Sequence, residues 1–253
     1  TREAKGEIIL FTDADCIADA DWIKEMVRPF ANPEVIGVKG AYKNREERLI
    51  ARLAQVEFEE RYRLLEKNRE GIDMVDTYSG GFRRDIFLKM GGFDTSFSVA
   101  NNEDTEFSYR LFFQNYKLVF NRRAIVYHLG HPKTLIQYLR LKFGRGYWRM
   151  VVYKRFPKKM GKDSYTPQIM KLQVLLFYLF ILSGFSITIV PAAGYFLLFT
   201  AVLFLTSTIP FFLLSLKEGL LLGLASPLFL TARAASLGAG AIIGLFHRRR
   251  KIL

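Results

Sequence analysis

The 253-residue sequence is poor in cysteine and histidine, with one cysteine, Cys16, and three histidines. A single cysteine cannot form an internal disulfide framework, and so few soft ligands exclude a cysteine-rich zinc scaffold. Acidic residues are also nearly absent from the second half of the chain, where residues 122–253 carry two of the 24 Asp and Glu residues. Basic residues therefore dominate that half.

The formal net charge of +13 is concentrated in one part of the chain. Residues 1–121 have a net charge of −4, whereas residues 122–163 hold 12 basic residues and one acidic residue. A nucleic-acid-binding protein is expected to spread Lys and Arg over a folded face. Here they collect just before a long apolar tract, which is typical of a membrane junction. We therefore expect contact with membrane lipids and no nucleic-acid partner.

The apolar tract runs from Leu172 to Leu216 without a charged residue, and Pro191 and Gly194 interrupt it. A membrane-spanning helix needs about 20 apolar residues, so the tract predicts two transmembrane helices over residues 172–190 and 194–216. A buried helix pair of a soluble protein is the alternative, but neither segment has the polar face of such a helix. The tract lies too far from the first residue to be a signal peptide.

A further apolar stretch, from Leu220 to Phe246, contains Pro227 and Arg233 and is followed by the basic run 248–251. A third span would place this run on the side opposite to the basic cluster at residues 140–162, against the positive-inside rule. A re-entrant or interfacial segment, with Arg233 facing protein or water, satisfies the rule. Because the first loops usually dominate orientation, a third span stays open beside it.

The first 131 residues alternate short apolar runs with amphipathic stretches, as in a layered α/β domain. The expected strands are residues 7–12, 35–40, 116–120 and 124–127, and the expected helices are residues 21–30, 46–68 and 104–115. The chain thus divides into an α/β domain (1–131), a basic juxtamembrane segment (132–168), two transmembrane helices (169–216) and a third spanning or re-entrant helix with a basic tail (217–253).

Two aspartates directly follow the first expected strand. In an open α/β sheet, ligands bind beyond the carboxyl ends of the strands, and Asp13 and Asp15 stand at that place. Carboxylates two residues apart at a strand end can both reach one Mg²⁺ or Mn²⁺ ion that bridges diphosphate oxygens. Asp-x-Asp is also common at turns and helix caps, so the pair needs support from elsewhere in the sequence.

A second acidic group, Glu103, Asp104 and Glu106, opens the last helix expected in this domain. Acidic residues in a first helical turn can simply be favourable partners of the helix dipole, and this is the simpler interpretation of Glu106. Glu103 and Asp104, at the junction of loop and helix, also suit a general base that takes a proton from an attacking hydroxyl.

Five segments agree in order and spacing with one known family. They are residues 8–15 (IILFTDAD), 78–84 (YSGGFRR), 91–94 (GGFD), 103–111 (EDTEFSYRL) and 126–128 (VYH). Over residues 1–150 the chain resembles the second half of the catalytic domain of family 2 glycosyltransferases of the GT-A type. The resemblance implies an α/β, partial GT-A (Rossmann-like) domain followed by transmembrane α-helices. It also implies metal-dependent, inverting transfer of a sugar from a nucleotide-diphosphate sugar to a lipid-linked or polysaccharide acceptor.

The resemblance assigns roles at the donor site. Asp13 and Asp15 match the motif that holds Mg²⁺ or Mn²⁺ and the donor diphosphate, with Asp15 as the more direct ligand. His128 falls where many relatives place a histidine on the metal or diphosphate, although a lone histidine at a strand end is as often structural. His131 is a weaker candidate for the same role.

The resemblance also assigns roles at the acceptor site. Asp104 matches the base that activates the acceptor hydroxyl, with Glu103 as its neighbour. Such a displacement needs one base and one stabilised leaving group, and no covalent nucleophile. Gly80 and Gly81 match a turn where the backbone approaches the sugar or acceptor, which the missing side chain of glycine permits.

Arg145 and Trp148 lie where membrane-bound processive relatives carry a Gln-x-x-Arg-Trp motif near the acceptor. The match is partial, because Tyr147 and not arginine precedes Trp148. The favoured alternative is a basic, aromatic helix in the lipid headgroups, beside a site that a lipid-linked acceptor can reach. We expect an integral membrane protein of a prokaryotic plasma membrane with its catalytic domain in the cytoplasm.

Relatives carry most contacts to the donor base and ribose on a segment before Asp-x-Asp, whereas this sequence starts at Thr1, close before Asp13. We therefore expect an amino-terminally truncated chain that shows no nucleotide-sugar turnover until it is extended. A non-catalytic scaffold for polysaccharide assembly or export is the alternative function. A transporter is disfavoured because two or three spans leave little room for a midplane binding site.

Overall fold

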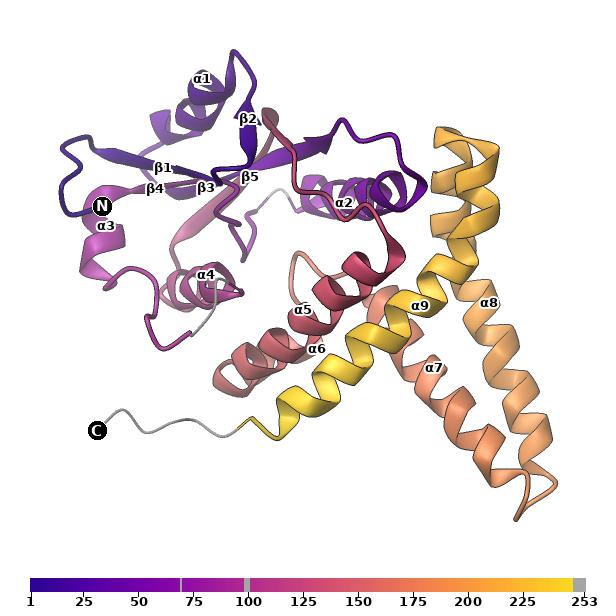
Figure 1. The fold of residues 1–253 in the computed structure, drawn as a ribbon. Helices are drawn as coiled ribbons and strands as arrows, with labels where there is room; N and C mark the ends of the chain where they lie inside the picture. The colour runs from indigo at the N-terminus through magenta and orange to yellow at the C-terminus, as the bar shows by residue number, and fades with distance from the viewer. Residues whose placement is uncertain (69, 98–100, 248–253) are drawn as a thin grey trace.

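The computed structural model spans residues 1–253 and describes all of them except 69, 98–100 and 248–253. One five-stranded sheet forms the centre of the amino-terminal domain (Figure 1), in the order β1-β4-β3-β5-β2. Its strands are β1 (Ile8–Thr12), β2 (Cys16–Ala18), β3 (Val35–Asn44), β4 (Ser79–Arg83) and β5 (Lys117–His128). Only β3 and β5 pair in parallel, and the other neighbours are antiparallel.

Helices cover both faces of this sheet. Helix α1 (Trp22–Val27) packs on one face, and α2 (Leu49–Lys67) and α4 (Glu103–Phe113) lie on the other, as Figure 1 shows. Helix α3 (Arg84–Lys89) follows β4 directly. The side chain of Trp22 donates to Ser79 Oγ at 2.9 Å on the α1 face, whereas Phe82 packs against Phe107 of α4 at a centroid distance of 5.1 Å. The predicted mixed α/β domain is therefore confirmed.

Three local predictions were wrong in detail. The helix expected over residues 21–30 changes at Arg28 into a 3₁₀ turn, η1 (Arg28–Ala31), because Pro29 cannot donate a helical hydrogen bond. The two strands expected between residues 116 and 127 form one continuous strand, β5. The short strand β2 was not predicted, because three residues carry too little pattern to identify it.

Gly80 and Gly81 lie inside β4 and not in the turn expected for them. Both are buried, and β4 is paired on one side with β1 and on the other with β3. A Cβ atom on Gly80 would lie 2.7 Å from the carbonyl oxygen of Asp76, and one on Gly81 would lie 2.7 Å from Leu10 Cδ2. The two glycines thus let a loop and a neighbouring strand pack closely against β4.

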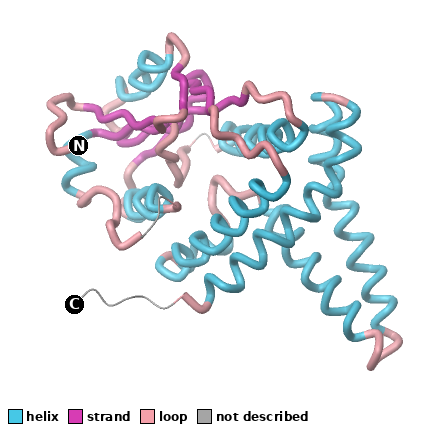
Figure 2. Tube along the Cα trace, in the orientation of Figure 1, coloured by secondary structure: helices cyan, strands magenta, loops and turns pink. Residues whose placement is uncertain are grey.

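The sheet is followed by α5 (Leu135–Arg155) and the short α6 (Pro157–Gly161). Thr134 and Gln137 form a capping box that fixes the start of α5. Three helices long and apolar enough to cross a membrane come next, namely α7 (Gln168–Ser186), α8 (Ala193–Glu218) and α9 (Leu220–Leu245). The expected pair at 172–190 and 194–216 corresponds to α7 and α8, which project together away from the sheet domain (Figure 2). The basic run 248–251 lies outside the described residues.

Helices α5 and α9 run side by side in the same direction (Figure 1). Ser236 Oγ donates to the carbonyl oxygen of Leu139 at 2.6 Å. A Cβ atom on Gly146 would overlap the backbone of Leu237, and one on Gly240 would overlap the backbone of Phe143. Glycines on both helices therefore bring the two backbones into direct contact.

A buried ionic network joins the sheet domain to the membrane helices. Glu57 of α2 is 1% exposed and accepts from Lys142 of α5 at 2.5 Å, from Arg233 of α9 at 2.8 Å and from the Tyr138 hydroxyl at 2.8 Å. Burial would raise the pKa of Glu57, but the surrounding cations hold it below its usual value. Arg233 therefore faces protein and not lipid.

Candidate active site

A cavity of about 950 Å³ lies between the sheet domain and helices α5, α7 and α9. Its sheet-domain end is acidic and includes Asp13, Asp76, Glu103 and Asp104. Its opposite end is formed by apolar side chains of the membrane helices, among them Val174, Leu175, Leu237 and Ile242. One continuous space therefore connects Asp13, Glu103 and Asp104 with the apolar helices, whereas Asp15 and His128 are not among the described residues that line it.

Asp13, Asp15, Cys16 and His128 form a cluster at one edge of the sheet. Each offers one ligand atom, and these atoms all lie within 4.8 Å of one another. The pairing of β2 with β5 places Cys16 opposite His128, and the Leu129 amide donates to the carbonyl oxygen of Asp15 at 2.8 Å. The sequence had suggested Asp13, Asp15 and His128 for this place, but not Cys16.

The surroundings shift the acidity of these groups. Burial and the neighbouring Asp15 raise the pKa of Asp13, and burial raises the pKa of the Cys16 thiol to about 11. Burial lowers the pKa of His128 despite the two nearby aspartates, so its imidazole is neutral at pH 7 and free to act as a ligand. His128 Nε2 lies 3.3 Å from Asp15 Oδ2.

The cluster fits a divalent cation. Its donors are two carboxylates and an imidazole, which suit Mn²⁺ and Mg²⁺, together with one softer thiol. His128 Nδ1 is buried without a hydrogen-bond partner among the described residues, which leaves that nitrogen unsatisfied. Gly130 allows the chain to pass close to this group, because a Cβ atom there would overlap Asp15 Oδ2.

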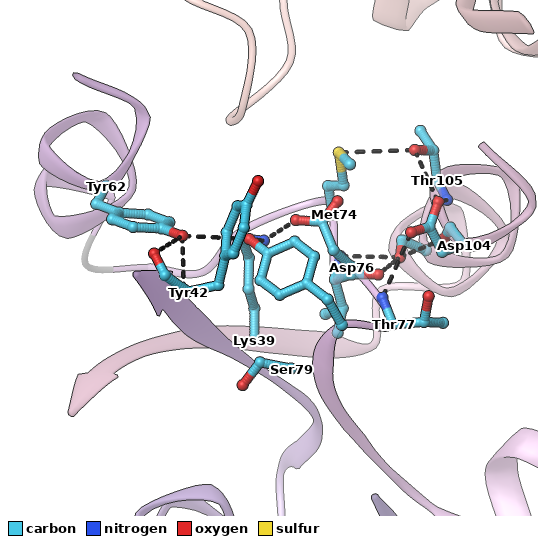
Figure 3. Close-up of polar contacts among 12 residues, drawn as sticks. Lys39, Tyr42, Tyr62, Met74, Asp76, Thr77, Ser79, Asp104 and Thr105 are labelled. Carbon is cyan, nitrogen blue, oxygen red and sulfur yellow. Dashed lines mark hydrogen bonds and ion pairs between the residues drawn. The ribbon is translucent and has the colours of Figure 1, made fainter. Parts of the chain in front are cut away.

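Glu103 and Asp104 occupy the first turn of α4. The turn starts from Asn102, whose φ of 65° lies in the left-handed region. Asp104 Oδ1 accepts from the Thr105 amide at 2.6 Å, and Oδ2 accepts from the Thr77 amide at 3.4 Å (Figure 3). These donors orient the carboxylate at the cavity wall. Glu103 Oε2 has no partner among the described residues, and burial beside Asp104 raises the pKa of Glu103.

Sequence reasoning missed a buried pair beside Asp104. Lys39 of β3 donates to Asp76 (Figure 3). It also donates to the Tyr78 hydroxyl at 2.8 Å. Lys39 is fully buried, and burial lowers its pKa well below the usual value. Asp76 lies in a loop with no pattern of its own, so only the pairing of β3 with β4 could have identified it.

The remaining predicted residues are separated in space. Among the described residues, those around the cavity include Arg145 but not Trp148, Gly80 or Gly81. Trp148 packs against Phe97 and His247 at centroid distances of 5.5 and 5.7 Å. His131 is buried among aromatic rings, and neither of its ring nitrogens has a hydrogen-bond partner in the described part of the chain.

Comparison with known proteins identifies the family. The family model described as Glycosyl transferase family group 2 matches residues 8–230, which is most of the chain. The chain belongs to this family. The family 2 glycosyltransferase resemblance found in the motifs is therefore confirmed, and so is the GT-A-like domain followed by three long apolar helices.

Two relatives of this glycosyltransferase carry informative names. It is 26% identical over 187 residues to the glucosyl-dolichyl phosphate glucuronosyltransferase of Haloferax volcanii, covering 67% of this chain and 59% of that protein. Its fold is similar to that of the mannosyltransferase PcManGT of Pyrobaculum calidifontis, solved in complex with GDP-Man and Mn²⁺. That match has a TM-score of 0.53 and 18% identity, and covers 97% of this chain and 64% of that one. The chain thus spans about three-fifths of the length of either protein.

Proposed function

We propose that this protein is a membrane-bound, metal-dependent, inverting glycosyltransferase that moves a sugar from a nucleotide-diphosphate sugar to a lipid-linked acceptor. The observation that carries the proposal is the single cavity that Asp13 and Asp104 line together with the membrane helices α7 and α9. The name of the Haloferax volcanii relative, which includes a dolichyl phosphate, supports a lipid-linked acceptor. The complex of PcManGT with GDP-Man and Mn²⁺ supports a nucleotide-sugar donor and a divalent metal.

In the proposed site, Asp13, Asp15 and His128 hold Mn²⁺ or Mg²⁺ beside the donor diphosphate. The bound ion would stabilise the charge that develops on the departing nucleotide. Cys16 stands within reach of the same place. Gly80 serves indirectly, because it allows the Asp76 loop to lie against β4 at the cavity wall.

Asp104 is the proposed base at the acceptor side. The acceptor hydroxyl oxygen attacks the anomeric carbon, the bond from that carbon to the diphosphate oxygen breaks, and the hydroxyl proton passes to the Asp104 carboxylate. The amides of Thr77 and Thr105 hold that carboxylate in place. Glu103 precedes it in the first turn of α4 and lines the same cavity. One direct displacement inverts the configuration at the anomeric carbon.

The membrane part is proposed to consist of the spanning hairpin α7–α8 and of α9 lying along the membrane surface on the catalytic side. The catalytic domain then lies in the cytoplasm of a prokaryotic cell, where nucleotide sugars are made. Helix α5, with the aromatic Trp148, contacts lipid headgroups beside the cavity that Arg145 lines. The head group of a lipid acceptor can then enter the cavity while its alkyl chain stays in the bilayer.

The test is sugar transfer by the protein expressed from its complete reading frame, in membranes containing polyprenyl phosphates and a panel of nucleotide sugars. Asp104→Asn should lower kcat by about 10²- to 10⁴-fold, the usual contribution of a general base. Donor affinity should stay within twofold. A non-catalytic scaffold would show no transfer in either form, and full activity of Asp104→Asn would contradict the assigned base.

A further inference from the structure

Five basic side chains line the cavity, and two of them are already neutralised. Lys142 is paired with Glu57 at 2.5 Å, and Lys171 with Asp163 at 3.5 Å. The other three are Arg61 of α2 and Arg145 and Arg149 of α5. Within the part of the chain that the structure describes, none of these three has a carboxylate oxygen within 4.0 Å.

Arg61 is the most informative of the three. It is only 5% exposed, and its Nη1 is buried without a hydrogen-bond partner among the described residues. Its guanidinium lies 5.3 Å from the ring of Phe58 and 5.0 Å from that of Tyr165, which are weak substitutes for an anion. The nearest acidic neighbour in sequence, Glu60, makes no ion pair with it. Glu57 and Glu60 attract this guanidinium only from beyond 4.0 Å. A buried guanidinium without a direct hydrogen-bonded anion is costly, so the position points to a negatively charged ligand.

The two arginines of α5 extend the same cationic patch. Arg145 and Arg149 are four residues apart, and side chains at this spacing share one face of a helix. Among the described residues, the side chain of Arg149 reaches only the sulfur of Met74 at 3.6 Å and the Tyr109 hydroxyl at 3.5 Å. In the same part of the chain, Arg145 contacts only the ring of Phe58, at 5.8 Å. Neither contact satisfies a guanidinium, which binds phosphate oxygens in pairs.

The three arginines line the same space as the acidic and apolar ends of the cavity. Asp13 and Asp104 mark the acidic end, and Val174 and Leu237 of the membrane helices belong to the apolar end. A ligand that satisfies all three parts carries a hydroxyl group, an anion and a long alkyl chain. That outline matches a phosphate ester of a long-chain alcohol that also carries a sugar, whose hydroxyl group is the acceptor.

We propose that Arg61, Arg145 and Arg149 form an anion subsite that binds the phosphate group of a lipid-linked acceptor. Its assignment to an acceptor rests on the proposed function. The subsite fixes the phosphate while the alkyl chain lies along α7 and α9, and it thereby sets how far the accepting hydroxyl stands from Asp104. The diphosphate of the donor is the other anion that these arginines can bind. The experiment below distinguishes it from the lipid phosphate.

The experiment measures binding and needs no turnover. The purified protein in detergent micelles is titrated with a C55 polyprenyl phosphate, with the neutral C55 polyprenol and with GDP or UDP in the presence of Mn²⁺. The unmodified protein should bind the polyprenyl phosphate at least tenfold more tightly than the polyprenol. Arg145→Gln and Arg61→Gln should each weaken phosphate-lipid binding about tenfold or more, the loss expected for a charge-assisted hydrogen bond, and leave nucleotide binding within twofold.

Arg140→Gln is the matched control, because Arg140 is an exposed arginine of the same helix and does not line the cavity. Thermal unfolding of each variant checks that it folds, and Arg61→Lys should recover part of the lost affinity if Arg61→Gln is stable. If Arg145→Gln loses no affinity for the phosphate lipid, or loses nucleotide affinity instead, the subsite is overturned. If the protein binds the phosphate lipid through these arginines but transfers no sugar, the proposed function is contradicted and the anion subsite is still supported.

Discussion

At the scale of single residues, the proposed metal cluster (Asp13, Asp15, Cys16 and His128) combines predicted and unpredicted side chains. Asp13 and Asp15 could be found from their place after a strand, whereas Cys16 could not, because its nearness to His128 depends on the pairing of β2 with β5. A strand of three residues leaves no pattern in the sequence. The roles of Asp13, Asp15 and His128 remain predictions until metal binding is measured.

The composition of this cluster predicts how it discriminates between metals. Asp15→Asn should weaken Mn²⁺ binding at least tenfold, because Mn²⁺ depends on carboxylate oxygens. Cys16→Ser should leave Mn²⁺ affinity within twofold but lower the affinity for Zn²⁺, which accepts thiolate ligands. Electron paramagnetic resonance of free Mn²⁺, with Zn²⁺ as competitor, measures both constants. Equal losses of both metals in Cys16→Ser would contradict this arrangement of ligands.

Gly80 supports the cavity wall through packing, which the structure revealed and the motif did not. In Gly80→Ala the new methyl group would lie 2.7 Å from the carbonyl oxygen of Asp76, so the Asp76 loop must shift. We expect a loss of about 1–3 kcal/mol in the free energy of unfolding, measured by denaturant titration in detergent. Gly161→Ala is the control, since nothing lies within 4 Å of the added atom. Equal stability of both variants would show that the loop is not held against β4.

At the scale of elements, the path of α9 relative to the membrane determines the topology of the protein. Both of its ends are tied to cytoplasm-facing parts in the proposed arrangement. Near its start, Arg52 of α2 donates to the carbonyl oxygen of Glu218 at 2.5 Å. At its end, Lys154 of α5 donates to the carbonyl oxygen of Leu245. In the proposed arrangement these two contacts place both ends of α9 beside cytoplasm-facing helices.

We therefore predict that the carboxyl end of α9 lies on the same side as the catalytic domain. In a Cys16→Ser background, a cysteine placed at Phe246, which is 78% exposed, should react with a membrane-impermeant maleimide only in inside-out vesicles. A cysteine placed at Ile189 in the α7–α8 turn, 83% exposed, should react only in right-side-out cells. Labelling of both positions in right-side-out cells would establish a third span.

The sequence predicted α7 and α8 well because membrane helices are defined by composition alone. It could not decide how α9 lies, because that depends on Arg233 meeting Glu57, 176 positions earlier in the chain. The contact of α9 with α5 likewise depends on glycines whose role appears only when the two backbones meet. Long-range contacts of this kind leave no periodic pattern.

At the scale of the whole molecule, the catalytic domain and the membrane helices share one cavity. The family could be predicted because five short segments resemble its motifs in order and spacing. The mixed α/β fold could be predicted because short apolar runs alternate with amphipathic stretches. The cavity could not be predicted, because Arg61, Asp76 and Arg149 meet there from three separate elements. The acceptor subsite proposed above therefore emerges only from the assembled structure.

The measurement that tests this account most directly is the effect of bound Mn²⁺ on the ³¹P relaxation of a bound C55 polyprenyl phosphate. If the metal cluster and the lipid site belong to one cavity, Mn²⁺ should strongly broaden the ³¹P signal of the polyprenyl phosphate that is bound to the unmodified protein. Asp15→Asn should remove that broadening while the lipid stays bound. A ³¹P signal that is unaffected by Mn²⁺ in the unmodified protein would place metal and acceptor in separate sites and contradict the account.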